Sequence, residues 1–315
     1  YPILLKATAG GGGRGMRRVD NPAQLRPAFE EASREAEKAF GDGGLYMEKF
    51  VVGGRHIEFQ ILADHYGKVI HLGERECSIQ RNHQKLLEES PGNHLPAGLR
   101  EEMGARIVKA LEKVGYRNAG TIELLMDSDG RLYFMEMNTR IQVEHPVTEM
   151  VTGVDLVAWQ LRIAAGERLA LGQDDVRWSG HAIECRINAE DVTANFRPNP
   201  GLVTRFEFPE TSPTGKLRLD SHVLAGYRIP PNYDSMVGKL IAWSATREGA
   251  VRTLARALAE TRVGGVATTI PLHRAILSTR PLWRATTTRR FSPPTPKCSS
   301  GRPSYPSTEA PWHAS

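Results

Sequence analysis

The fold is indicated most clearly by residues 120–138, which read GTIELLMDSDGRLYFMEMN. Two apolar runs flank the dipeptide Asp129-Gly130, which is typical of a tight turn between antiparallel strands. If these two residues form the loop, counting outward pairs Leu125 with Phe134. The stretch therefore predicts a hairpin with a defined register.

The same count places Glu123 directly opposite Glu136 on one face of the hairpin. Like charges opposed across two strands destabilise a sheet, so the arrangement favours a bound cation. Mg²⁺ prefers carboxylate oxygens together with phosphate oxygens, and Asn138 offers a third oxygen two residues beyond Glu136. The alternative is an ordinary hairpin with two solvated carboxylates.

The segment after the hairpin carries further polar candidates. Arg140 and Glu144 follow the predicted metal ligands, with Gln142 between them. A fixed arginine can hold a small planar anion through two hydrogen bonds, and a nearby carboxylate can act as a general base. The segment predicts an anion site beside the cation site. The alternative is a surface loop with an incidental ion pair.

A glycine-rich loop follows a short predicted strand near the start of the chain. Gly10, Gly12 and Gly15 match the spacing GxGxxG, and glycines let backbone N–H groups approach a phosphate closely. A dinucleotide fingerprint needs a helix directly after the loop, whereas the helix here begins only at Pro22. A Walker A loop is excluded because methionine follows Gly15. Two interpretations stay open: a phosphate-binding flap with Lys6 at its base, or a plain flexible loop.

Basic side chains gather in a segment between the two sites. Arg81, His83 and Lys85 follow a predicted strand, with Gln80 beside them. They are suited to contact a nucleotide or an anion, but taken alone the segment fits a solvated basic face better. His56 lies at a strand start, where a histidine more often has a structural role.

Hydrophobic periodicity predicts the remaining elements and a change of character along the chain. Helices are predicted over residues 22–40, 100–115, 154–165 and 247–259. Strands are predicted over residues 3–5, 56–62, 68–73, 181–188, 201–208, 216–224 and 236–243. The sequence becomes richer in strands after about Gly166, which places a domain boundary there.

The charge is distributed unevenly. The 315 residues include 41 Lys and Arg and 36 Asp and Glu, which gives a net charge of +5. Residues 280–315 hold six basic residues and one acidic residue, so the whole excess lies in this Pro-, Ser- and Thr-rich tail. The tail is predicted to be disordered, and residues 1–279 are neutral overall. A nucleic-acid partner is therefore not expected.

The composition also bears on the compartment. No apolar run approaches the ~20 residues of a membrane helix, so a membrane protein is not expected. Cys77, Cys185 and Cys298 are widely spaced and odd in number, which favours a reducing compartment. We expect the cytoplasm, with an organelle matrix or stroma as the alternative.

Taken together, these segments resemble biotin carboxylase, a member of the ATP-grasp superfamily. The resemblance runs over about residues 1–279 and is carried by residues 5–16, 46–50, 73–85, 136–150, 181–191 and 230–240. It implies an α+β chain with a partial ATP-grasp domain over residues 1–165. A biotin carboxylase C-terminal domain would follow over residues 166–279, and the tail would occupy residues 280–315.

The resemblance also implies roles for individual residues. The ATP phosphates would be contacted by Lys6, Gly12 and Gly13. Adenine would be read by the hinge of Glu48, Lys49, Phe50 and Val51. The rest of the nucleotide site would be lined by His56, Gln80 and His83. The ligands of Mg²⁺ or Mn²⁺ would be Glu123, Glu136 and Asn138. Bicarbonate would be held by Lys85, Arg140 and Val143. Glu144 would be the base that deprotonates bicarbonate, and Arg186 would steady the biotin enolate.

The implied reaction is the first half-reaction of an acyl-CoA carboxylase such as acetyl-CoA carboxylase, in fatty acid biosynthesis. Bicarbonate attacks the γ-phosphate of ATP, and the resulting carboxyphosphate delivers CO₂ to biotin. The implied partners are a biotin carboxyl carrier protein, a carboxyltransferase and a second copy in a homodimer. Another ATP-grasp ligase, such as carbamoyl-phosphate synthetase, is a more distant alternative.

Two departures from the family pattern favour a rival expectation. The family's N-terminal domain and the start of its ATP-grasp module have no counterpart here, and the basic tail replaces a further helical segment. We therefore expect either a biotin carboxylase or a truncated, inactive chain that only binds nucleotide or a partner subunit. A shifted reading frame after residue 277, or a mispredicted coding end, would explain the tail.

Overall fold

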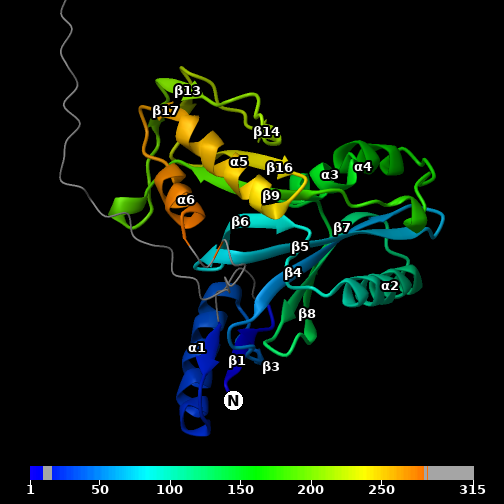
Figure 1. The fold of residues 1–315 in the computed structure, drawn as a ribbon. Helices are drawn as coiled ribbons and strands as arrows, with labels where there is room; N and C mark the ends of the chain where they lie inside the picture. The colour runs from blue at the N-terminus through cyan, green and yellow to red at the C-terminus, as the bar shows by residue number, and fades with distance from the viewer. Residues whose placement is uncertain (10–15, 280–281, 283–315) are drawn as a thin grey trace, which may run out of the picture.

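The computed structural model describes residues 1–9, 16–279 and 282. A large antiparallel sheet forms the centre of the molecule, and a small sheet with its own helix projects from it (Figure 1). The predicted α+β character is confirmed. Of the predicted tail, the structure describes only Leu282, which is buried and whose carbonyl accepts a hydrogen bond from Arg247 at 2.7 Å.

The small sheet has the strand order β2-β1-β3. Its strands are β1 (Ile3–Ala7), β2 (Arg17–Val19) and β3 (Leu45–Lys49). The predicted flap between two strands therefore joins β1 to β2, and its residues 10–15, with Gly12 and Gly13, lie outside the described residues. A 3-10 turn (η1, Pro22–Gln24) leads into α1 (Leu25–Phe40). Asn21 caps the turn as predicted, by accepting from the Gln24 N–H at 3.3 Å.

The large sheet has the strand order β14-β16-β9-β6-β5-β4-β7-β8. Its first strands along the chain are β4 (Arg55–Ala63), β5 (Val69–Arg81), β6 (Gln84–Ser90), β7 (Asn118–Met126) and β8 (Leu132–Asn138). The others are β9 (His181–Asn188), β14 (Lys216–Asp220) and β16 (Met236–Ser244). Both faces of its central strands are buried, because helices cover the sheet on both sides (Figure 1).

In the part of the chain that the structure describes, five helices cover the large sheet. They are α2 (Ala97–Val114), α3 (His145–Thr152), α4 (Leu156–Ala164), α5 (Arg247–Glu260) and α6 (Ile270–Leu277). The apolar face of α2 packs against Ile57, Phe59 and Ile61 of β4, and α4 packs against Leu62 and Ile70. On the other half of the sheet, α5 packs against the apolar side of β9, while α3 covers its opposite side.

Several short elements complete the chain between α4 and α6. They are η2 (Gln173–Asp175), β10 (Glu190–Asp191), η3 (Val192–Ala194), β11 (Arg197–Pro198), β12 (Gly201–Leu202), β13 (Arg205–Glu207), β15 (Arg228–Ile229) and β17 (Arg262–Gly264). The single strand predicted over residues 201–208 is wrong. The chain changes partner within it, because the Val203 N–H donates to Tyr227 whereas the Thr204 N–H donates to Gly264.

The predicted hairpin is present, and Glu123 pairs with Glu136 across β7 and β8 as the count required. The prediction is confirmed for the two glutamates. It is wrong nearer the turn, where Phe134 pairs with Leu124 instead of Leu125.

Two offsets of one residue explain this outcome. The Asp127 N–H donates to the Arg131 carbonyl at 3.0 Å, so three residues form the loop instead of two. Gly130 takes a φ of +79° there, which glycine adopts without strain. An extra residue in β8, Met135, then shifts the register back by one position. The glutamates are paired because the longer loop and the bulge each shift the register by one residue, in opposite directions.

The predicted division near Gly166 falls within one continuous sheet. The pairing of β6 with β9 joins residues 84–90 to residues 181–188, so strands from both sides of the boundary share backbone hydrogen bonds. The domain limits therefore stay a prediction. None of the helices in the described ranges is long and apolar enough to cross a membrane.

Candidate active site

A cavity of about 440 Å³ lies over one face of the large sheet. Side chains from β4 through β9 and from the segment before α3 line it. Eleven of the predicted site residues contribute to its wall. They are His56, Gln80, His83, Lys85, Glu123, Glu136, Asn138, Arg140, Val143, Glu144 and Arg186. Segments far apart in the sequence thus meet at the place where the sequence predicted a metal site and an anion site.

Lys85 is the central cation of this cavity. Its ammonium group donates to Glu58 Oε2 at 2.6 Å, to Glu123 Oε1 at 3.1 Å and to Glu144 Oε1. Burial opposes its charge, but the surrounding carboxylates outweigh burial and raise its pKa. Lys85 is therefore a fixed, charged group, and the interpretation of this segment as a solvated basic face is wrong for this residue.

Glu144 is held between two cations. Lys85 reaches one carboxylate oxygen, and Arg186 Nη2 donates to the other at 2.8 Å. Arg186 also donates through Nε to Glu88 Oε1 at 2.6 Å. A carboxylate in this position can accept a proton from a small acid beside it, while the two cations stabilise negative charge that develops there.

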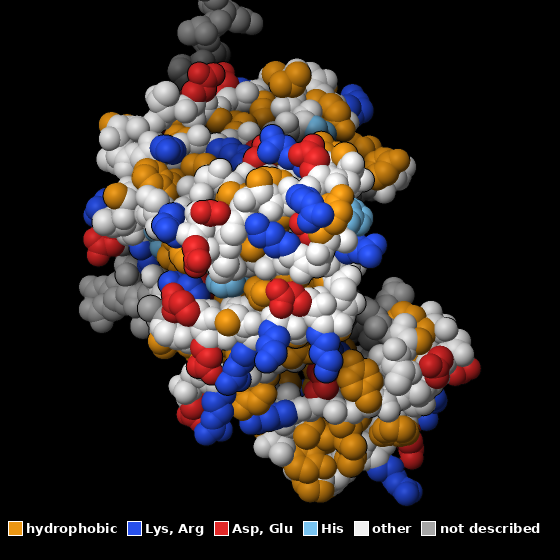
Figure 2. All heavy atoms as spheres, turned by 90° about the vertical axis from the view of Figure 1, so that its right-hand side faces the viewer, with side chains coloured by type: hydrophobic (Ala, Val, Ile, Leu, Met, Phe, Trp, Pro, Cys, Tyr) orange, Lys and Arg blue, Asp and Glu red, His pale blue; other side chains and the backbone are white. Residues whose placement is uncertain are grey.

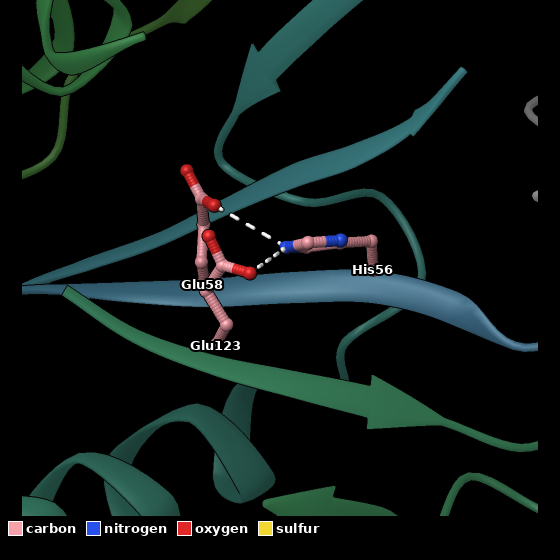
Figure 3. A group of neighbouring side chains, drawn as sticks. All are labelled: His56, Glu58 and Glu123. Carbon is pink, nitrogen blue, oxygen red and sulfur yellow. Dashed lines mark ion pairs between the residues drawn. The ribbon is translucent and has the colours of Figure 1, made fainter. Parts of the chain in front are cut away.

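His56 joins two carboxylates on neighbouring strands (Figure 3). Its Nε2 lies 3.2 Å from Glu123 Oε2 and 3.4 Å from Glu58 Oε2. Burial opposes protonation of His56, but hydrogen bonds to the two glutamates outweigh it and raise its pKa. Burial alone would raise the pKa of Glu123, yet the contacts with His56 and Lys85 lower it to about 2. Glu123 therefore carries a negative charge over the ordinary pH range.

The predicted metal ligands converge on one point. Asn138 Nδ2 donates to Glu123 Oε1 at 3.2 Å and to Glu136 Oε1 at 3.3 Å. Oxygens from two strands thus lie within hydrogen-bond distance of a single atom, and such oxygens are the donors that Mg²⁺ prefers. A half turn of the amide exchanges its oxygen and nitrogen, so all three residues can offer oxygen. The donor set fits Mg²⁺ or Mn²⁺.

Arg140 and Val143 also line the cavity. Arg140 is exposed, and its guanidinium donates to Asn138 Oδ1 and to the Ile141 carbonyl, each at 3.2 Å. Lys239 comes from β16 and donates to the Val143 carbonyl at 2.5 Å. The guanidinium of Arg140 is therefore exposed beside Asn138, whereas the backbone at Val143 is anchored by Lys239.

Five predicted nucleotide-site residues do not line this cavity, and Gly12 and Gly13 lie outside the described residues. Lys6 pairs with Glu48 at 3.2 Å, and Lys49 donates to the Tyr133 hydroxyl at 3.1 Å. Phe50 packs under the Arg18 guanidinium. Lys6 lies on β1 of the small sheet. The predicted hinge lies at the end of β3 and in the segment directly after it, which includes Phe50 and Val51. Their predicted contacts with ATP stay predictions.

The sequence did not reveal the buried support beneath the cavity. Arg75 is fully buried, and it donates to Glu58 Oε1 at 2.6 Å and to Gln60 Oε1 at 2.7 Å. It also reaches Gln142 at 3.1 Å, and Gln142 in turn donates to Glu123 Oε1 at 2.7 Å. The available signal was the alternation His56-x-Glu58-x-Gln60 on β4, which places three polar side chains on a face that is buried.

One face of the molecule has mixed charge. Figure 2 shows basic and acidic side chains side by side over most of one face of the molecule. This agrees with the even balance of charges in residues 1–279.

Comparisons with known proteins place this site in a family context. Residues 1–171 match the family model described as carbamoyl-phosphate synthase L chain, ATP binding domain. Residues 184–291 match the biotin carboxylase C-terminal domain, twelve residues beyond the predicted boundary at residue 279. The second match separates the chain from carbamoyl-phosphate synthetase, the more distant alternative.

Individual relatives give the same result. A biotin carboxylase of Nostoc sp. is 58% identical over 277 residues, which cover 88% of this chain and 61% of that protein. A chloroplastic biotin carboxylase of Arabidopsis thaliana is 54% identical, over 88% of this chain and 51% of that protein. This chain therefore spans between half and two thirds of the length of these relatives.

A solved structure shows the same fold. It is the biotin carboxylase domain dimer of Hydrogenobacter thermophilus 2-oxoglutarate carboxylase, in complex with MgADP, ADP and bicarbonate. The TM-score is 0.87 at 51% identity, over 92% of this chain and 64% of that one.

Proposed function

The chain belongs to the biotin carboxylase family, with an ATP-grasp domain followed by the biotin carboxylase C-terminal domain, and we propose that it carries out the ATP- and bicarbonate-dependent carboxylation of biotin. The observation that carries the proposal is Glu144, held between Lys85 and Arg186 in the cavity that also contains the predicted metal ligands. A cavity that combines a base, positively charged side chains and a predicted metal site suits the activation of a small acid toward a phosphate.

In the proposed first step, Lys85, Arg140 and the backbone at Val143 hold bicarbonate beside Glu144. Glu144 accepts the bicarbonate proton as the bicarbonate oxygen bonds to the γ-phosphorus of ATP and the bond to ADP breaks. A metal ion held by Glu123, Glu136 and Asn138 would neutralise charge on the phosphate oxygens.

In the second step, Arg186 stabilises charge on biotin. Carboxyphosphate releases CO₂, and the phosphate formed accepts the N–H proton of biotin, so that the ureido nitrogen bonds to CO₂. The enolate oxygen of biotin is negative during this transfer, and the guanidinium of Arg186 at the cavity wall is the group proposed to balance it. The same proposal includes contacts with the nucleotide. The residues proposed to make them are Lys6, Glu48, Lys49, Phe50, Val51, Gln80 and His83.

The proposed partners follow from the chemistry. Biotin reaches the cavity on a carboxyl carrier protein, and a carboxyltransferase uses the carboxybiotin for acetyl-CoA or another acceptor. The similar Hydrogenobacter structure is a dimer from a 2-oxoglutarate carboxylase, so a homodimer is proposed here, and the final acceptor can differ between relatives. The proposed compartment is the cytoplasm, or the stroma in view of the chloroplastic relative.

The test is ATP hydrolysis that depends on both bicarbonate and biotin. We expect the chain to show it, Glu144→Gln to abolish it, and Arg186→Ala to abolish the part that needs biotin. Isothermal titration with MgADP should be run on the same samples. Binding of MgADP without any hydrolysis above the Glu144→Gln level would favour the rival, a chain that only binds nucleotide.

A further inference from the structure

Two glutamates lie directly opposite each other beneath Arg186. Glu88 on β6 pairs in register with Glu184 on β9, and both side chains are fully buried. Glu88 Oε1 accepts from Arg186 Nε at 2.6 Å. Glu88 Oε2 and both oxygens of Glu184 have no hydrogen-bond partner among the residues that the structure describes.

The nearby charged groups are engaged elsewhere. Lys239 donates to the Val143 carbonyl at 2.5 Å and lies 3.5 Å from Asp220. On α3, which covers this side of the sheet, His145 contacts the Gln142 carbonyl at 2.8 Å through Nδ1. Its Nε2 faces Glu149 at 3.9 Å. Arg186 divides its donors between Glu88 and Glu144. None of these described groups donates to Glu184.

A pair of this kind is unstable with two negative charges. An ionised carboxylate is a pure acceptor, so two ionised glutamates cannot hydrogen-bond to each other. A buried charge without a partner costs several kcal/mol, and in such cases the group takes up a proton instead. One proton between the two side chains removes the repulsion and supplies the missing donor.

We propose that Glu184 is a neutral carboxylic acid at neutral pH, that its O–H donates to Glu88 Oε2, and that this pair positions Arg186. The protonation follows from the packing alone. The importance of Arg186 rests on the proposed function.

The electrostatics of the pair agree with this arrangement. Burial raises the pKa of Glu184 well above its ordinary value, and the charge of Glu88 raises it further. Burial also raises the pKa of Glu88, although Arg186 acts in the opposite direction. Two carboxyl groups that interact strongly titrate as one unit, so the pair keeps one proton while Glu88 keeps the charge that Arg186 needs.

The shared proton has a geometric consequence for Arg186. A carboxylate with two free oxygens can hold an arginine through two parallel hydrogen bonds. If Glu88 did so, the second donor of Arg186 would turn from Glu144 toward the sheet. Because the Glu184 proton occupies Glu88 Oε2, Glu88 binds Nε alone. Nη2 of Arg186 then points to Glu144 and the cavity, as the structure shows.

Infrared spectroscopy of the chain tests the protonation directly. We expect a C=O stretch of a protonated carboxyl group at pH 7, which shifts in D₂O and is absent in Glu184→Gln. Glu207→Gln is the matched control, because Glu207 is exposed and should leave the band unchanged. No such band at pH 7, or a band that persists in Glu184→Gln, would overturn the proposal.

The pH dependence of stability provides a second test. A raised pKa in the folded state means that the contribution of Glu184 to stability is full below its ordinary pKa and is lost as the pH rises toward the folded value. The melting temperature of the wild type should therefore fall relative to that of Glu184→Gln as the pH rises above the ordinary pKa of a carboxyl group. A difference that does not change with pH would show that Glu184 is ionised throughout.

The positioning role is read from Arg186 itself. Hydrogen exchange of the Arg186 Nε–H, assigned in the NMR spectrum with Arg186→Lys, reports whether Glu88 still holds it. Glu184→Gln retains a donor toward Glu88 and should keep the wild-type exchange, whereas Glu184→Leu leaves Glu88 Oε2 open to a second donor of Arg186 and should slow the exchange about tenfold. Equal exchange in both variants would refute the positioning role. None of these tests requires catalysis, so their failure is distinguishable from failure of the proposed function.

Discussion

Replacing Arg75 with methionine should lower the free energy of unfolding by about 3 kcal/mol. Methionine has a similar length but cannot donate hydrogen bonds. The side chain of Arg75 is fully buried, so water cannot replace the contacts that the substitution removes. Arg75 is therefore expected to be one of the most sensitive positions beneath the cavity.

The size of the effect follows from the partners of Arg75. Its guanidinium makes five hydrogen bonds, to Glu58, Gln60, Thr121, Gln142 and Thr148, at 2.6 to 3.3 Å. Removing one partner of a buried ion pair costs about 3–5 kcal/mol. The lower end applies here because Lys85 still pairs with the other oxygen of Glu58 at 2.6 Å.

Urea unfolding, followed by circular dichroism, measures this loss. With a denaturant slope of about 3 kcal/mol per M, the midpoint should fall by about 1 M. The matched control is Arg205→Met, which makes the same chemical change in an exposed pair with Glu207. Exposed pairs contribute about 0–1 kcal/mol, so the control should unfold nearly as wild type does. If Arg75→Met unfolded within about 1 kcal/mol of Arg205→Met, the reasoning about this buried network would be refuted.

Three further changes have defined expectations. In Glu136→Gln, the gain in ADP affinity on adding Mg²⁺ should be about tenfold smaller than in wild type, because a neutral amide is a poorer ligand for a hard cation. Titration calorimetry with and without Mg²⁺ measures this gain. Lys239→Met frees the Val143 carbonyl and should weaken bicarbonate binding about tenfold, since a buried charged hydrogen bond is lost, while ADP binding stays unchanged. Burial would raise the pKa of Glu89, but His181 and Arg247 lower it to about 2. The charged form of Glu89 therefore stabilises the fold above pH 4.5, and this contribution is lost as the pH falls toward 2. Glu89→Gln should be less stable than wild type above pH 4.5, and the difference should vanish toward pH 2.

Each of these three expectations has its own control. Glu102→Gln changes an exposed glutamate of α2 and should leave Mg²⁺ dependence intact; equal losses in both variants would contradict the metal assignment. For Lys239→Met, an equal loss of ADP and bicarbonate binding would indicate general disorder instead of a local release. For Glu89, thermal melts of both proteins across the acid range should converge; a constant gap would show that its charge does not contribute.

The sequence predicted the elements with strong periodicity well, because burial in the fold follows the same pattern. Strand β9 has the predicted bounds, and α5 differs by one residue at its C-terminal end. Helix α3 was not predicted, since eight residues with a proline near the start offer little periodicity.

The candidate site shows what local patterns leave out. The opposition of Glu123 and Glu136 was predicted correctly, although the loop is longer than assumed and a bulge at Met135 restores the register. Neither offset is visible in an alternating pattern, because both are set by backbone hydrogen bonds within the turn and the sheet. Arg75 and Glu184 escaped notice for a related reason. A charged residue in a strand looks solvated until the packing on both faces of the sheet is known.

The seam between β6 and β9 constrains how this protein can be recombined. The two family models divide the chain between residues 171 and 184, which invites chimeras joined at that point. Such a junction would take Lys85 from one parent and Arg186 from the other, together with opposite members of the Glu88–Glu184 pair. Hybrids should therefore keep activity only when both parents carry matched residues on β6 and β9, and exchange of this region is best planned by strand pairs instead of by sequence blocks.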